Sequence, residues 1–201
     1  MQGMPPVIQL KQAVFGQEDH PVVGPLDLVI HPGDKVLLEG PSGCGKTSVL
    51  RGILGFLRRL TGSYDIHGEP ARHRAILRFR QETSYITQEL MVGSGPVHAW
   101  LAGQSVSFHE TDLTRFQLSS SILEQALDEL SRGERQRLAI IVALARKPSI
   151  FLLDEITSAL NDDLRALVVA HFSSLDSTVI SVSHDDAWRK NGAFHSYPLP
   201  A

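Results

Sequence analysis

Residues 40–47 combine the residue types that bind a nucleotide phosphate chain, because they fit the pattern G-x-x-x-x-G-K-[ST]. In such a loop the glycines let backbone N–H groups surround phosphate oxygens, and a helix N-terminus adds partial positive charge. Lys46 would reach the β- and γ-phosphates, and the Thr47 hydroxyl would bind Mg²⁺. The alternative is a glycine-rich turn between core elements. The predicted phosphate-binding residues are Gly40, Pro41, Ser42, Gly43, Cys44, Gly45, Lys46, Thr47 and Ser48.

Two acids close a second chemically informative segment. Residues 150–153 are an uninterrupted apolar run, followed by Asp154 and Glu155. This is the form of a parallel strand buried on both faces, with carboxylates at the sheet edge where ligands bind. Asp154 would hold Mg²⁺, and Glu155 would orient and deprotonate the water that attacks the γ-phosphate. A solvated strand end is the alternative interpretation.

A third segment, residues 130–137, predicts a helix start that can face an anion. Ser131 precedes Glu134 by three positions, which predicts a capping box between the two side chains. Other amides near Ser131 and Gly133, together with the helix dipole, would remain free for phosphate. The alternative interpretation is simply a well-capped helix. The helix that follows shares one apolar face, formed by Leu138, Ile141, Val142 and Ala145.

The elements around these segments are those the chemistry needs. The apolar residues 36–38 predict a buried strand before the glycine loop, and the spacing of apolar residues in 48–54 predicts a helix after it. Between residues 89 and 129 the sequence turns to Gly-, Ser- and His-rich loops with short amphipathic pieces such as 122–127. Further strands are expected near 7–14, 25–30, 35–39, 63–67, up to Gln88, at 150–155 and at 178–183, with a helix at 162–173.

Composition limits the class of protein. The chain has 201 residues, enough for one well-buried α/β domain, and its 42% hydrophobic content is that of an ordinary globular protein. A formal charge of −3 gives no general attraction to nucleic acid, so no nucleic-acid partner is expected. The single cysteine, and an N-terminus with neither the positive nor the apolar region of a signal peptide, favour the cytoplasm. The longest apolar stretch, residues 138–145, is far too short to span a bilayer.

Taken together, these segments resemble an ATP-binding-cassette (ABC) ATPase over essentially the whole chain. The family signature L-S-G-G-Q corresponds to residues 130–134, with Arg132 in place of glycine and Glu134 in place of glutamine. The resemblance implies that Gln88 senses Mg²⁺ and the attacking water, and that His184 contacts the γ-phosphate. Residues 158–161 resemble the D-loop S-A-L-D, with asparagine as the last residue.

The resemblance also implies an adenine contact and a fold. Phe15 lies 25 residues before Gly40, where the family places an aromatic that stacks on adenine, although an ordinary core phenylalanine is nearly as good an interpretation. The implied fold class is α/β: a P-loop NTPase with a RecA-like core at about 1–88 and 131–201, an antiparallel β subdomain, and a compact helical subdomain at about 89–130.

What the resemblance implies for function is an ATP-binding and ATP-hydrolysing transporter subunit that uses ATP and Mg²⁺. Two copies would bind head to tail, each nucleotide lying between one phosphate loop and the partner's signature. An integral membrane permease subunit would dock near residues 90–100, which would place the protein at the inner face of the cell membrane. The finer resemblance is to small bacterial iron-export ATP-binding subunits. Two alternatives are a soluble ABC ATPase acting on nucleic acid or ribosomes and a nucleotide-binding scaffold without hydrolysis.

Overall fold

The computed structural model of the chain describes residues 4–87, 95–104, 106–107 and 109–199. Its centre is a sheet in which every neighbouring pair of strands is parallel. The strands, in spatial order, are β6 (Thr83–Ile86), β7 (Ile150–Asp154), β8 (Thr178–Val182), β3 (Lys35–Glu39) and β9 (His195–Pro198). Every residue of β7 and β8 is buried, which accounts for the continuous apolar runs in the sequence.

The strand order of this sheet brings distant parts of the chain to one edge. Because β6, β7, β8 and β3 are parallel neighbours, the residues that follow their carboxyl ends meet at the same edge. The register places Val182 at the end of β8 opposite both Asp154 of β7 and Leu38 of β3. The glycine loop, the two acids and the residues around His184 all follow these strand ends.

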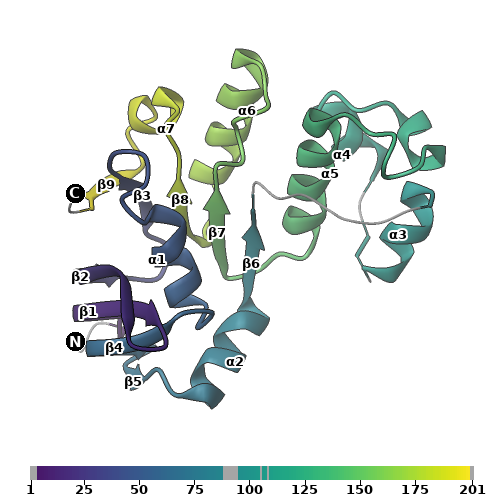
Figure 1. Ribbon diagram of the computed structural model, residues 1–201. Helices are drawn as coiled ribbons and strands as arrows, with labels where there is room; N and C mark the ends of the chain where they lie inside the picture. The colour runs from purple at the N-terminus through teal and green to yellow at the C-terminus, as the bar shows by residue number, and fades with distance from the viewer. Residues whose placement is uncertain (1–3, 88–94, 105, 108, 200–201) are drawn as a thin grey trace.

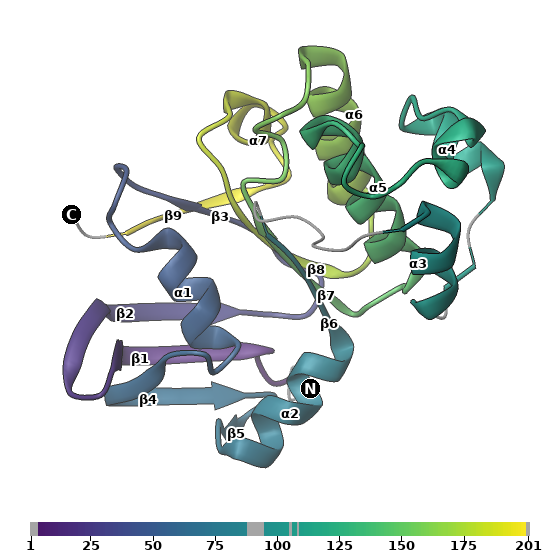
Figure 2. The ribbon, with the colours of Figure 1, turned by 45° about the vertical axis from the view of Figure 1, so that its right-hand side comes forward.

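A second, antiparallel sheet lies beside the first, as the sequence led us to expect. Its first two strands are longer than predicted, because they form a long hairpin in which one set of side chains is buried. The strands, in spatial order, are β2 (His20–Ile30), β1 (Ile8–Gln17), β4 (Arg58–Ile66) and β5 (Glu69–Pro70). The helix α1 (Lys46–Ile53) packs over this sheet (Figure 2), and its predicted apolar face is buried. The helix α2 (His73–Glu82), which the sequence did not indicate, leads into β6.

Another group of helices lies on the other side of the central strands from α1 (Figure 1). They are α5 (Arg132–Ala145), α6 (Asp162–Ser173) and the short α7 (Asp186–Lys190). Their apolar residues share a core cluster with Phe151 of β7, in which Phe172 and Trp188 are fully buried. Among the residues that the structure describes, every helix is too short or too polar to cross a lipid bilayer.

Short helical pieces pack against α5 at the far end of the molecule in Figure 1. They are α3 (Val97–Gly103), α4 (Glu110–Arg115) and the 3₁₀ helix η1 (Ser120–Glu124). One buried residue from each, Val97, Leu113 and Ile122, joins the core cluster that includes Leu138 of α5. Arg137 of α5 adds hydrogen bonds of 3.2 and 2.9 Å to the carbonyl oxygens of residues 116 and 117.

The amphipathic piece at 122–127, which lies in the predicted helical subdomain, is only partly helical. Only residues 120–124 are helical, and the turn is 3₁₀. The next residues are drawn into extended pairing with the segment before α3, since the Val97 N–H donates to the Gln125 carbonyl oxygen at 2.9 Å and the Leu127 N–H donates to that of Gly95 at 3.0 Å. Ile122 and Leu127 are buried even so, which explains their apolar pattern.

Candidate nucleotide-binding and hydrolysis site

The glycine loop turns the chain from β3 into α1 through backbone conformations that side chains disfavour. Gly43 and Gly45 have φ angles of 84° and 95°, in the left-handed region where glycine is preferred. Gly45 is also the N-cap of α1, and a Cβ there would lie 2.9 Å from the Cγ2 of Val23 on the hairpin. Around Gly43 a Cβ would meet no atom within 4 Å, so the loop is open on that side.

Lys46 is held across the mouth of this loop. Its side chain is almost fully buried, and its Nζ donates to the carbonyl oxygens of Gly40 at 2.8 Å and Pro41 at 2.9 Å. An ammonium group has three N–H donors, and the third has no partner within the described part of the chain. The geometry therefore leaves Lys46 both fixed and able to donate to an anion at the loop.

Thr47 and Asp154 meet although they are 107 residues apart in sequence. The Thr47 Oγ1 donates to the Asp154 Oδ1 at 2.9 Å, and the Tyr85 hydroxyl contacts the Asp154 Oδ2 at 3.4 Å. Burial raises the pKa of Asp154, its hydrogen bond with Thr47 opposes the rise, and the charge of Glu155 adds a smaller increase. Burial, with the charge of Asp154, also raises the pKa of Tyr85 to about 12.

These oxygens are a suitable donor set for a magnesium ion. Mg²⁺ prefers hydroxyl and carboxylate oxygens, and it commonly takes one or two protein ligands while phosphates and water supply the rest. Consistent with this, the described ranges contain no cluster of three or more His, Cys, Asp or Glu side chains that could hold a metal without such help. A cation here would also compensate the buried Asp154 carboxylate. Thr47 and Asp154 therefore fit the predicted metal site.

Glu155 and His184 also come together at this edge. Glu155 follows β7 in a left-handed conformation with φ of 53°, and its N–H donates to the Val182 carbonyl oxygen at 2.9 Å. The His184 Nε2 lies 3.6 Å from the Glu155 Oε1. The side chain of His184 is 54% exposed and that of Glu155 is 29% exposed, so both can reach a solvent-accessible reactant. The pair can supply a carboxylate base and an imidazole donor at one place.

Gln136 is a residue of this site to which the sequence interpretation gave no role. It is 1% exposed on α5, and its Nε2 donates to the backbone carbonyl oxygen of Glu155 at 3.2 Å. Its Oε1 is buried without a hydrogen-bond partner in the described structure. Nothing in the sequence signals this role, because Gln136 stands between Arg135 and Arg137 and its burial is visible only in the structure. The contact connects α5 directly to the backbone of the candidate base.

The capping box predicted at the start of α5 is confirmed. The Ser131 Oγ and Ser131 N–H both donate to the Glu134 Oε2, at 2.6 and 2.9 Å, and the Glu134 N–H donates to the Ser131 Oγ at 3.3 Å. These two bonds from Ser131, first the hydroxyl and then the backbone one, lower the pKa of Glu134. Ser131 and Arg132 are exposed, so this helix start faces outward.

The chain does not bring its own signature to its own phosphate loop. The helices α1 and α5 lie on opposite sides of strands β6, β7 and β8 in Figure 1. Gly133 instead lies close to the D-loop region, since a Cβ there would be 3.2 Å from the Ala159 carbonyl oxygen. Asn161, where the family has aspartate, caps α6, since its Oδ1 accepts from the Leu164 N–H at 2.9 Å, a bond that aspartate could also form.

Phe15 requires a correction. Its side chain is 1% exposed, its ring meets Tyr64 edge-on at 5.8 Å between centroids, and it packs closely against Gly52 of α1. A ring enclosed on its faces in this way cannot stack on adenine, so the alternative of an ordinary core phenylalanine is correct. Gln88, which was predicted to sense Mg²⁺ and the attacking water, lies outside the described residues.

The phosphate loop at the carboxyl edge of a parallel sheet, with a hydroxyl, two acids and a histidine beside it, defines the class of P-loop nucleotide-binding proteins. Residues 23–158 match the sequence profile of the family described as ABC transporter. This match covers more than half of the chain, and the chain therefore belongs to the ABC transporter family. Members of this family are ATPases, and the chain is an ATP-binding ATPase of that family.

The relatives include both importers and exporters by name. The chain is 28% identical over 197 residues to the probable iron export ATP-binding protein FetA of Escherichia coli K12, across 92% of this chain and 88% of FetA. It is 30% identical over 192 residues to the spermidine/putrescine import ATP-binding protein PotA of Mannheimia succiniciproducens, across 90% of this chain and 52% of PotA. The resemblance to ABC transporter ATP-binding subunits is thus confirmed.

Solved structures show the same fold. A bacterial Atm1-family ABC exporter with ATP bound matches with a TM-score of 0.82 and 20% identity, over 100% of this chain and 40% of the exporter chain. A component of the cbiONQ ABC transporter complex from Clostridium perfringens matches with a TM-score of 0.74 and 18% identity, over 97% of this chain and 85% of the other. The predicted α/β P-loop fold class is confirmed.

Proposed function

We propose that this ATPase is the energy-supplying subunit of an ABC transporter, which dimerises around ATP and drives an integral membrane partner. The observation that carries the proposal is the division of its functional groups. Lys46, Asp154 and Glu155 gather at one sheet edge, whereas Ser131 and Gly133 start a helix on the other side of the central strands. A second copy, placed head to tail, would bring its signature to the nucleotide of the first.

Each residue has a role in this proposal. The backbone N–H groups of residues 40–48 bind the phosphates and Lys46 neutralises the β- and γ-phosphates. Thr47 and Asp154 hold Mg²⁺, which when bound balances the phosphate charge. Glu155 accepts a proton from the attacking water, and His184 donates to the γ-phosphate. Gln88 is assigned to the metal and the attacking water, and Ser131 and Gly133 to the phosphate of the opposite subunit.

A groove between the central sheet and the helical part supports the assignment of a membrane partner. A cavity of about 170 Å³ lies there, lined in part by Thr87 after β6, Trp100 of α3 and Ala139 of α5. Its floor combines apolar and polar groups, as a docked partner helix requires. The relatives' names differ in substrate and direction, so the proposal includes neither.

The partner can be tested by affinity capture of the tagged protein from native membranes, with and without detergent. We expect a polytopic membrane protein to be recovered in stoichiometric amount, and the protein to leave the membrane fraction when that partner is deleted. Trp100→Ala, which removes one wall of the groove, should reduce recovery, whereas the exposed Phe56→Ala, on the phosphate-loop side, should not. Recovery with ribosomes or DNA would favour the soluble alternative.

The dimer can be tested by sedimentation of Glu155→Gln with Mg-ATP, because blocked hydrolysis should trap the closed form. Arg132→Gly tests the signature surface in the same assay. If Arg132 pairs with phosphate across the interface, its loss should weaken ATP-driven dimerisation and make it less sensitive to salt. A monomeric Glu155→Gln variant at saturating Mg-ATP would contradict the nucleotide sandwich.

A further inference from the structure

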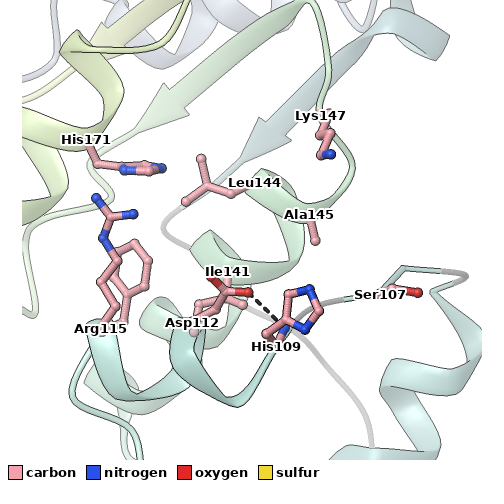
Figure 3. A pocket seen from close by; sticks show the side chains of 10 residues that line it. Ser107, His109, Asp112, Arg115, Ile141, Leu144, Ala145, Lys147 and His171 are labelled. Carbon is pink, nitrogen blue, oxygen red and sulfur yellow. Dashed lines mark hydrogen bonds between the residues drawn. The ribbon is translucent and has the colours of Figure 1, made fainter.

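A cavity of about 230 Å³ lies away from the proposed nucleotide site, between α4, the C-terminal end of α5 and α6 (Figure 3). No residue that lines it has a role in the proposed ATPase function. Its lining combines apolar and polar side chains, a combination typical of small-molecule sites. The apolar lining includes Phe116, Ile141 and Leu144, and the polar lining includes His109, Asp112, Arg115, Lys147 and His171.

Two cations from different elements face this cavity without acidic partners. Arg115 ends α4 and Lys147 follows α5, and within the described ranges neither forms an ion pair. The one acid of the lining, Asp112, is engaged locally, since its Oδ2 accepts from the His109 N–H at 2.9 Å in the cap of α4. With the Asp112 carboxylate counted, and leaving the histidines aside, Arg115 and Lys147 give the lining one positive charge in excess, which an anion can neutralise.

His171 adds an imidazole to the polar lining. Its Nδ1 is buried and has no hydrogen-bond partner in the described structure, while the other ring nitrogen, Nε2, lies at the outer end of the ring. Burial, with the nearby charge of Arg115, lowers the pKa of His171, while Asp112 acts in the other direction. The ring is therefore neutral at neutral pH, when it can donate one hydrogen bond and accept another. Its outer end reaches toward the cavity beside Leu144 (Figure 3).

Lys147 joins the lining from a backbone position that is unusual for its residue type. This residue has φ of 49°, and its N–H closes the end of α5 by donating to the Leu144 carbonyl oxygen at 3.0 Å. Left-handed positions at helix ends are usually glycine or asparagine, because other side chains are strained there. The lysine at this position nevertheless lines the cavity.

We infer that this cavity binds a small organic carboxylate with a compact apolar body. Arg115 binds the carboxylate beside His171, and Lys147 adds positive charge from the other end of the lining (Figure 3). Ile141 and Leu144 cover the apolar body, and His171 pairs with a polar substituent or water beside it. Because α4 belongs to the helical part of the chain and α6 packs on the central sheet, a bound carboxylate bridges the two. The site is separate from ATP hydrolysis, so it does not depend on the proposed function.

Benzoate is a suitable probe, with benzamide as the neutral molecule of the same shape. Titration of the full chain, labelled with ¹⁵N at histidine, should show saturable shifts of the His171 ring signals with benzoate. Arg115→Gln and Lys147→Gln should each raise the Kd for benzoate at least tenfold. Lys11→Gln, which removes an exposed cation from the antiparallel sheet, should leave the Kd unchanged.

Three outcomes would overturn the inference. Absence of saturable shifts would exclude carboxylate binding, and an equal Kd for benzamide would exclude recognition of the charge. Inorganic phosphate binding as tightly as benzoate would exclude a role for the apolar residues of the lining. None of these measurements uses ATP, so a failure here is distinguishable from a failure of the proposed ATPase function.

Discussion

Two regions of this chain hold their functional groups in different ways: the phosphate-loop half, which contains Lys46, Asp154 and Glu155, and the signature half, which contains residues 130–134 at the start of α5. Lys46 and Asp154 are buried and hydrogen-bonded to groups fixed by the central sheet. Ser131 and Arg132 are exposed at a helix start, where the main constraint is a local cap with Glu134. The first half is organised within the chain, while the second is presented outward. This difference is the one that the proposed head-to-tail dimer requires.

The largest expected effect comes from the phosphate-loop half. Glu155→Gln removes the candidate base while keeping the shape of the side chain, so it should lower ATP turnover by about 10²–10⁴-fold. Nucleotide affinity should change little, because phosphate binding depends on the loop and Lys46. Glu134→Gln is the matched control in the signature half, because the amide oxygen can still accept the hydrogen bonds from the Ser131 N–H and hydroxyl. It should not reproduce the loss of turnover. Turnover unchanged in Glu155→Gln would remove this residue from the mechanism.

A smaller effect is expected at Gln136, the one described contact from α5 to the backbone of the base. Gln136→Met keeps the buried volume but removes the bond to the Glu155 carbonyl oxygen, whose net contribution is about 0.5–1.5 kcal/mol. If Gln136 positions Glu155, kcat should fall about 2- to 12-fold with KM for ATP unchanged. A purely structural role would lower thermal stability and leave kcat unchanged in the folded fraction.

The smallest expected effect is one on the stability of the isolated chain, at the start of α5, and it is separate from the role proposed for Ser131 across the dimer. Ser131→Ala removes the side-chain cap of α5, which should cost about 1 kcal/mol and lower Tm by about 2–4 °C. The variant also makes stability less dependent on pH. Since Ser131 lowers the pKa of Glu134 from its ordinary value of 4.5, this stabilisation is present above that value and is lost as pH falls below it. Thermal melts at neutral and acidic pH measure both effects, and equal acid sensitivity in the variant would contradict the pairing.

The parts of the site that the sequence predicted depend on local chemistry. The loop at 40–47 needs glycine at left-handed positions, and the cap between Ser131 and Glu134 spans only three residues. Both are therefore visible as short patterns. Phe15 was misjudged because a spacing along the chain does not reveal which face of a strand a side chain takes. Its burial follows from the pairing of β1 with β4 and from Gly52 beneath the ring.

Contacts between distant segments were not predictable in the same way. Tyr85 and Gln136 act on Asp154 and Glu155 because the strand order places β6 beside β7 and because α5 packs against that pair. The short helices at 97–103 and 110–115 carry too few periodic residues for a pattern, and packing against α5 stabilises them. In the amphipathic piece at 122–127, residues 125 and 127 instead form strand-like hydrogen bonds with residues 97 and 95.

The sequence by itself determined that this protein binds a nucleotide phosphate chain and belongs to an α/β class, since glycine loops and fully apolar strands follow from the conformational and burial preferences of single residues. Only the tertiary structure decided which residues act together. Thr47 meets Asp154 across 107 positions, and the cavity that faces Arg115, Lys147 and His171 joins three elements. The physical reason is that such contacts arise from packing between elements, which no local segment encodes.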